Sequence, residues 1–157
     1  MKLSREFGRA VCGLVVLALV AAVATAGVRV PLEKVPAPAV KTVKDRFAKA
    51  EIRFVDKEGN GTYEFAMKEG DRQFDVGVSA EGKFLHVKEE ITADKVPAAV
   101  KEGVQKKFPG GKIIEAEKTT TGEGDSTKVT YELVVQTDKS KQAAAFDATG
   151  KYLGAPD

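Results

Sequence analysis

The chain has 157 residues, including 25 basic and 23 acidic side chains and a single histidine, His86. The first 26 residues carry three of the basic residues, one of the acidic residues and the only cysteine, Cys12, so the rest of the chain has 22 of each charge and no thiol. Balanced, interspersed charge argues against nucleic-acid binding. The part of the chain after residue 26, with one histidine and no thiol, lacks the usual ligands of zinc or copper.

The amino-terminal segment, Met1–Ala26, has the three parts of a secretory signal peptide. Basic residues precede an apolar run from Ala10 to Ala24, and Ala24-Thr25-Ala26 supplies the small residues of a cleavage site. We therefore predict cleavage after Ala26 and export to the periplasm or the cell exterior. A retained membrane anchor is the alternative, but a run of about fifteen apolar residues is shorter than the roughly 20 that span a bilayer. No membrane span is expected once the signal is removed.

The remainder of the chain is an internal duplication. A shift of 61 residues places residues 35–52 on residues 96–113, and a shift of 68 places residues 62–85 on residues 130–153. The shifts differ by a seven-residue insertion in the polar stretch Thr119–Ser126, where a loop would tolerate it. The predicted organisation is a spacer over residues 27–34, a first unit over residues 35–91 and a second unit over residues 92–157.

Each unit begins with a helix and continues as strands. Apolar residues recur at spacings of three and four along residues 40–47 and 100–108, which is typical of an amphipathic helix. Asp94 is expected to cap the second helix. Further on, apolar and polar residues alternate along Tyr63–Met67 and Phe74–Val78, as in antiparallel strands with one buried face. The predicted fold class is α+β, with two tandem units, each one helix packed on a three- to four-stranded antiparallel sheet.

Two features could carry chemistry. The segment Asp56–Gly61 matches the first positions of an EF-hand calcium loop, but the twelfth position is Met67 where a glutamate is required. A hairpin loop accounts for the same residues, and we prefer that interpretation. His86 has a glycine as its counterpart in the second copy, so the repeated scaffold does not need it. We expect His86 on a strand, near Glu89 and Glu90.

No residue pattern marks a catalytic centre. The sequence has no nucleophile-elbow, phosphate-loop or dinucleotide-binding glycine motif. The matching tyrosines Tyr63 and Tyr131 alternate with polar residues beside apolar ones, and we expect them in the core. We therefore predict no catalytic residue, no metal ligand and no cofactor, in a protein that is not an enzyme.

Several segments of the second unit resemble PepSY-like, β-lactamase-inhibitor-like domains of secreted bacterial proteins. The likeness runs through Val96–Lys101, Lys107–Ile113, Thr130–Leu133 and Phe146–Leu153, and the first unit shows it more loosely. It implies tandem helix-plus-sheet units whose sheets can form one broad surface facing a partner, export and, in some members, inhibition of a hydrolase. The disulfides of the best-known inhibitors have no counterpart here, so a β-lactamase target does not carry over.

Together these observations predict an exported, non-catalytic PepSY-like module that binds a protein outside the cytoplasm and inhibits or regulates a peptidase or another hydrolase. The partner surface is expected on the sheet face that the helices leave uncovered, with Arg53, Glu64 and Glu132 as candidate contacts. An ordinary solvated face would carry the same kinds of residue. The alternative is a periplasmic protein that binds a small ligand or a cation, for which Asp56–Asn60 is the lead.

Overall fold

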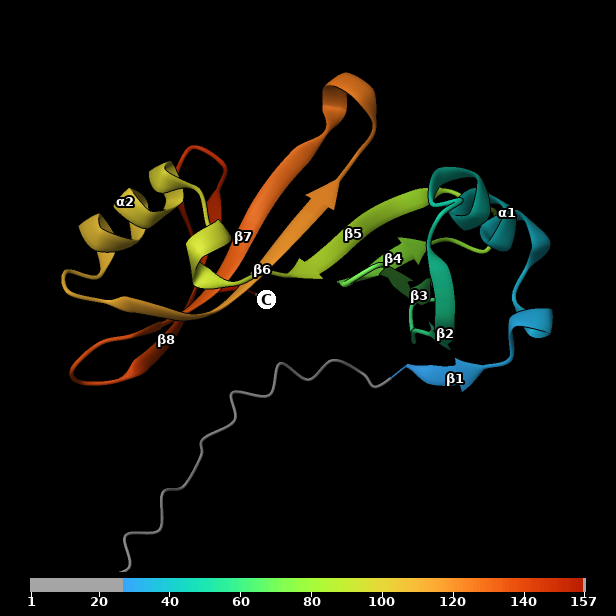
Figure 1. The fold of residues 1–157 in the computed structure, drawn as a ribbon, viewed down its shortest axis with the longest axis horizontal. Coiled ribbons are helices and arrows are strands. Elements are labelled where there is room, and N and C mark those ends of the chain that lie inside the picture. Colours follow the sequence, from blue (N-terminus) through green and yellow to red (C-terminus); the bar gives the residue numbers. More distant parts are fainter. Residues whose placement is uncertain (1–26, 157) are drawn as a thin grey trace, which may run out of the picture.

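The structure, a computed structural model, describes residues 27–156. The predicted signal peptide, Met1–Ala26, lies outside the described residues. In the described part, one antiparallel sheet of nine strands runs in chain order from β1 to β9 (Figure 1). The elements are β1 (Val28–Val30), α1 (Ala37–Arg46), β2 (Glu51–Lys57), β3 (Tyr63–Glu69), β4 (Arg72–Val78), β5 (Phe84–Glu90), α2 (Ala98–Lys107), β6 (Lys112–Thr121), β7 (Lys128–Gln136), β8 (Lys141–Asp147) and β9 (Tyr152–Gly154).

The helices α1 and α2 begin at equivalent positions of the duplication. Pro36 and Pro97 stand at their N-caps, where the N–H that proline lacks would have no partner within the helix. The prediction that Asp94 caps α2 is wrong, because Asp94 lies in a separate 3-10 turn before the helix. Within the described residues, neither helix has the length and apolar character needed to cross a membrane.

Strand β5 belongs to both units. It pairs with β4 of the first unit along one edge and with β6 of the second unit along the other. The pairing of β1 with β2 recurs in the pairing of β5 with β6. Val28 faces Lys57 in the first pair of strands, and the residues 61 positions later, Glu89 and Lys118, face each other in the second. Strand β1 is therefore the counterpart of the end of β5, and each unit has five strands, one of them shared.

The α+β class and the tandem arrangement are confirmed, but the expected three to four strands per unit are too few. Residues 27–34, predicted as a spacer, contain β1, and β5 closes one unit while it opens the next. Alternation of apolar and polar residues predicts a strand and its buried face. It carries no information on whether one or both edges of that strand are hydrogen-bonded, and a strand of three residues is too short to show it.

Both helices cover the same face of the sheet, as Figure 1 shows. A row of paired residues on this face runs from Val76 through Val87 and Thr120 to Val129, across the shared strand. Val76 is fully buried in the first core, and Val129 packs against the second. The opposite face of the sheet carries neither helix, and it is called the open face below.

Each helix buries its own apolar core. Val43 of α1 and its counterpart Val104 of α2 are both fully buried. Tyr63 and Tyr131 are only 7% and 6% exposed, which confirms the expectation that they belong to the cores. The residues that the two copies share are thus mainly those that fill these cores, so the duplication specifies the fold.

The insertion lies in the hairpin between β6 and β7. The polar stretch Thr119–Ser126, predicted as a loop, is a loop only in part, because Thr119–Thr121 extend β6 and Gly124–Ser126 form a 3-10 turn at the tip. The tip rises on the helix side of the sheet, between α1 and α2 (Figure 1). The extra residues therefore lengthen a paired strand as well as its turn.

The two units make the same contact between helix and turn in different ways. In the first unit, the hydroxyl of Thr42 on α1 donates a hydrogen bond of 2.7 Å to the carbonyl of Gly82, in the turn before β5. The counterpart of Thr42 in α2 is Gly103, and a Cβ added there would lie 2.1 Å from the carbonyl oxygen of Gly150. This close approach explains why α2 carries a glycine at its centre, where it costs about 1 kcal/mol in helix propensity.

We expect Gly103→Ala to lower the free energy of unfolding by about 1 kcal/mol or more, because pushing α2 away from the Gly150 turn costs more than the helix propensity gained. Urea unfolding followed by circular dichroism measures the change. Thr42→Ala, at the equivalent position of α1, serves as the control that loses one hydrogen bond, about 1 kcal/mol, without a clash. A stabilised Gly103→Ala variant would contradict the close approach.

Candidate partner-binding face

The open face presents its side chains in rows that cross the strands. One row runs from Asp56 through Glu64, Gly77 and His86 to Thr121. The next row contains Ala66, Asp75, Lys88, Thr119 and Thr130. Polar and small residues dominate because alternate positions of an antiparallel strand meet solvent when only one face is covered.

The three predicted contact residues all lie on the open face. Glu64 stands in the first row, Glu132 faces Glu117 across the β6–β7 pair, and Arg53 occupies a β-bulge of β2. Arg53 and Glu132 line two different surface hollows. The structure therefore spreads these residues along the face and does not gather them at one point.

The two hollows lie side by side and share Glu90 and Glu117, which face each other across the β5–β6 pair. The hollow of the first unit is lined by side chains of both charges, among them Arg53, Asp75 and Lys88. The hollow of the second unit is lined by four glutamates and by apolar residues, among them Glu115, Glu132, Ile114 and Ala143. The large side chains of Phe54 and Ile114 are 42% and 43% exposed here, so each hollow combines charge with an accessible apolar group.

His86 contacts a different carboxylate from those expected. It shares β5 with Glu89 and Glu90, but its Nε2 lies 2.9 Å from Oε1 of Glu64 on β3, across the intervening strand β4. That nitrogen is enclosed, and its contact with Glu64 is close without the alignment of a good hydrogen bond. The imidazole lies over Gly77, where an added Cβ would be 2.4 Å from Cε1 of His86. Gly77 falls in no turn, and it was the one sequence signal of this contact.

Asp75, in the next row, was not a candidate at the level of sequence. Partial desolvation raises the pKa of Asp75 above its ordinary value of 3.8, and Glu64 and Glu117 raise it further against the opposing effect of Lys88. The residue as a whole is exposed, so the desolvation of its carboxyl group is only partial. The neighbouring carboxylates therefore affect the pKa of Asp75 more strongly than the positive charge of Lys88 does.

The segment Asp56–Gly61 covers the end of β2 and most of the turn that leads to β3, so it belongs to a hairpin, which confirms the preferred interpretation. Asp56 makes an ion pair of 2.6 Å with Arg29, and Oδ1 of Asn60 accepts a hydrogen bond from the backbone N–H of Thr62. The ion pair joins β1 to β2, and the Asn60 hydrogen bond closes the turn of the hairpin. Over residues 27–156, no three histidine, cysteine, aspartate or glutamate side chains are grouped in a way that could hold a metal ion.

We expect Gly77→Ala to destabilise the protein by about 1–2 kcal/mol, because the added methyl group would displace the His86 ring from the sheet and from Glu64. In a His86→Ala background the same substitution should cost much less, since the ring is gone. A double-mutant cycle measured by urea unfolding gives the coupling. Equal costs in both backgrounds would show that the ring is not what Gly77 accommodates.

Asp75→Asn is expected to stabilise the protein near neutral pH and to lose that effect in acid. A carboxyl group whose pKa is raised by folding contributes stability below its ordinary value of 3.8 and loses it as the pH rises through the folded-state value. Asparagine stays neutral and escapes this loss. Urea unfolding at about pH 7 and about pH 3 tests the difference. A variant less stable than the parent at neutral pH would mean that the attraction of Lys88 dominates.

Comparison with known proteins identifies the family. Residues 22–86 and residues 80–151 each match the family described as β-lactamase-inhibitor-like, PepSY-like. The two matches overlap at residues 80–86, where the shared strand β5 begins. No curated protein is a significant match.

Solved structures from Bacteroides species have the same fold. They include a BLIP-like protein of Bacteroides fragilis, with 17% identity over 76% of this chain and 84% of that one and a TM-score of 0.63. A DUF2874 family protein of Bacteroides ovatus has 14% identity over 75% and 84% of the two chains, with a TM-score of 0.64. A protein of Bacteroides eggerthii assigned to the periplasm has 16% identity over 75% and 85%, with a TM-score of 0.59.

At such identities the likeness to these structures establishes the fold alone. The family matches carry more, because together they span residues 22–151 and follow the two units that the sheet pairing defines. The resemblance found in the sequence is thereby confirmed. This chain belongs to the PepSY-like, β-lactamase-inhibitor-like family and contains two copies of its domain.

Proposed function

We propose that this protein is an exported, non-catalytic binding module whose open face docks on a protein outside the cytoplasm, and that it inhibits or regulates a peptidase or another hydrolase. The observation that carries the proposal is the one-sided build of the sheet. Both helices and both cores lie on one face, so a nine-stranded surface remains available to a partner. The family description as β-lactamase-inhibitor-like agrees with this class of function.

Export is supported by the amino-terminal pattern of Met1–Ala26 and by the assignment of one similar structure to the periplasm. A non-catalytic role is supported by the way polar groups are used on the open face. The carboxylate of Asp56 is engaged by Arg29, and His86 lies against Glu64. These groups bind one another along a row, whereas a catalytic centre needs them to converge on a reacting atom.

The two hollows are where we place the partner. Phe54 and Ile114 offer exposed apolar anchors, and interface energy tends to concentrate on a few such groups. Arg53 lies beside the first anchor and Glu132 lines the same hollow as the second. Charged groups around apolar anchors favour selection of a partner whose charges are complementary.

The alternative of a small-ligand or cation-binding protein has less support. Its lead, Asp56–Asn60, is a hairpin in which Asp56 and Asn60 already have partners within the protein. Cation-dependent thermal stabilisation would be the sign of that function, because a ligand of the native state raises stability.

To test the proposal, the mature chain is immobilised and used to capture proteins from the envelope of its own cells, and the captured protein is assayed for inhibition of its hydrolytic activity. We expect one stoichiometric partner. The double charge reversal Arg53→Glu with Glu132→Lys should weaken its binding about tenfold or more, because the new charges repel groups that the native ones attract.

The matched control reverses two exposed charges on the helix side, Glu102→Lys with Lys106→Glu, and leaves the net charge equally unchanged. We expect this control to bind like the parent. Circular dichroism and urea unfolding must show that both double variants are folded. Capture of no stoichiometric partner, or equal loss of binding in both variants, would contradict docking through the open face.

A further inference from the structure

The insertion of the second unit changes what its hairpin can reach. In the first unit, β2 pairs with the edge strand β1 at three positions. In the second unit, the equivalent strand β6 pairs with β5 at five positions. Two of these five, Glu89 with Lys118 and Glu90 with Glu117, match pairs of the first unit. The three without a counterpart there are Thr119 with Lys88, Thr120 with Val87 and Thr121 with His86.

The part of β5 that receives these extra pairs is held by the first unit. On their other side, His86 faces Gly77, Val87 faces Val76 and Lys88 faces Asp75, all three on β4. The lengthened β6 therefore pairs with backbone that is already part of the first unit's sheet. The first copy of the duplication has no such extension, since β2 ends at Lys57.

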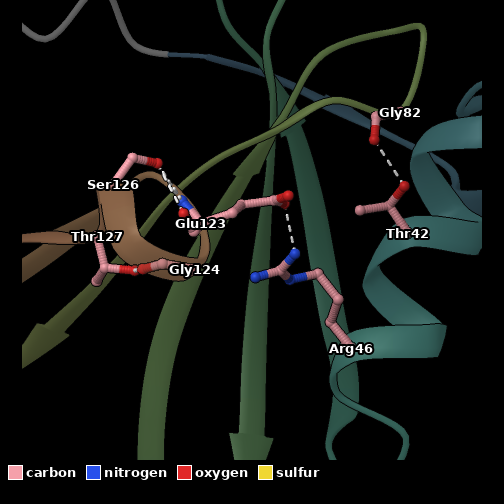
Figure 2. A network of polar contacts seen from close by, with 7 residues as sticks. All are labelled: Thr42, Arg46, Gly82, Glu123, Gly124, Ser126 and Thr127. Atoms are coloured by element: carbon pink, nitrogen blue, oxygen red, sulfur yellow. Dashed lines mark hydrogen bonds and ion pairs between the residues drawn. The ribbon is translucent and has the colours of Figure 1, made fainter.

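The tip of the hairpin continues to helix α1, as Figure 2 shows. Glu123 forms an ion pair with Arg46 at the carboxyl end of α1, 77 residues away in the sequence. The guanidinium carbon of Arg46 lies 4.1 Å from the ring centre of Phe84. Arg46 thus joins a carboxylate of the second unit to an aromatic ring of the shared strand.

Hydrogen bonds within the tip hold Glu123 in place. The hydroxyl of Ser126 donates to the carbonyl of Glu123 at 2.7 Å, and the hydroxyl of Thr127 donates to the carbonyl of Gly124 at 2.8 Å (Figure 2). Gly122 has a φ of +76°, and a Cβ there would lie 2.4 Å from the carbonyl oxygen of Ser126. The turn therefore has a defined backbone from which the Glu123 side chain extends to α1.

We propose that the insertion is a strap that ties the second unit to the helix and sheet of the first and so holds the two units at a fixed angle. Without it the units would be joined through the end of one shared strand, and neighbouring strands tolerate a wide range of twist. The ion pair of the strap lies on the helix side of the sheet, since Arg46 belongs to α1, whereas the two hollows meet at Glu90 and Glu117 on the open face. This inference concerns the molecule alone and does not depend on a partner.

The duplication supplies the variant that tests it. Replacing residues 119–130 with residues 58–62, the shorter hairpin of the first unit, removes seven residues and joins Lys118 to Tyr131 as Lys57 is joined to Tyr63. Spin labels at Lys44→Cys on α1 and Lys106→Cys on α2 report the distance between the units, since the chain beyond residue 26 has no cysteine of its own. Pulsed electron resonance gives the distribution of that distance.

We expect a narrow distribution in the parent and a clearly broader one in the graft, with amide exchange along β5 about tenfold faster or more. Glu123→Gln loses the ion pair with Arg46 but keeps a side-chain oxygen that accepts from the backbone N–H of Ser126 in the capping box, and it should give about threefold faster exchange at Ser126 and Thr127. Asp125→Asn is the matched control, because it removes a carboxylate from the same turn without removing that ion pair.

A graft that folds and keeps the narrow distribution would overturn the strap. If the graft fails to fold, the point variants decide. Equal exchange rates in the tip for Glu123→Gln and Asp125→Asn would then overturn it, and a rise confined to Glu123→Gln would support it. A failure of the strap would leave the proposed docking function untouched, because that function is tested by binding.

Discussion

The rest of the structure depends on the hydrogen bonding of β5 along both of its edges. One edge of this strand completes the sheet of the first unit and the other begins the sheet of the second. Side chains alternate between faces with a period of two, so the pairing of β5 sets the face on which each unit places its core. Because one strand satisfies both units, both cores come to lie on the same side of the sheet. The two units are therefore parts of one sheet, and cutting the chain between them would expose the backbone groups of both.

The two edges of this sheet are formed by short strands, which limits association with other chains. The outermost strands, β1 and β9, have three residues each, and they correspond to the two halves of β5. Short edge strands offer few free backbone groups to other chains, which is a common way to avoid edge-to-edge association. The strand of the repeat that forms each edge of the sheet as β1 or β9 therefore pairs on both sides, as β5, where the two units meet.

Concentrating both helices on one face has a chemical consequence for the other. The open face has no covering layer, and polar side chains of one row contact each other across the strands, as His86 contacts Glu64 over Gly77. Partial desolvation raises the pKa of Asp75, and the carboxylates of Glu64 and Glu117 raise it further, so a positively charged group of a partner would be attracted to this part of the face. The proposed function rests on this uncovered and incompletely neutralised surface.

The sequence by itself determined the helices, most strands, the turns, the core tyrosines and the duplication, because each of these follows from local periodicity and from comparison of the chain with itself. It also pointed to the open face as the place of Arg53, Glu64 and Glu132, since alternation assigns a face. Only the tertiary structure showed that β5 is shared, that residues 28–30 form an edge strand and that Glu123 reaches Arg46. These are pairings between residues far apart in the chain, and they depend on the energy of the whole sheet, which no local pattern of residues contains.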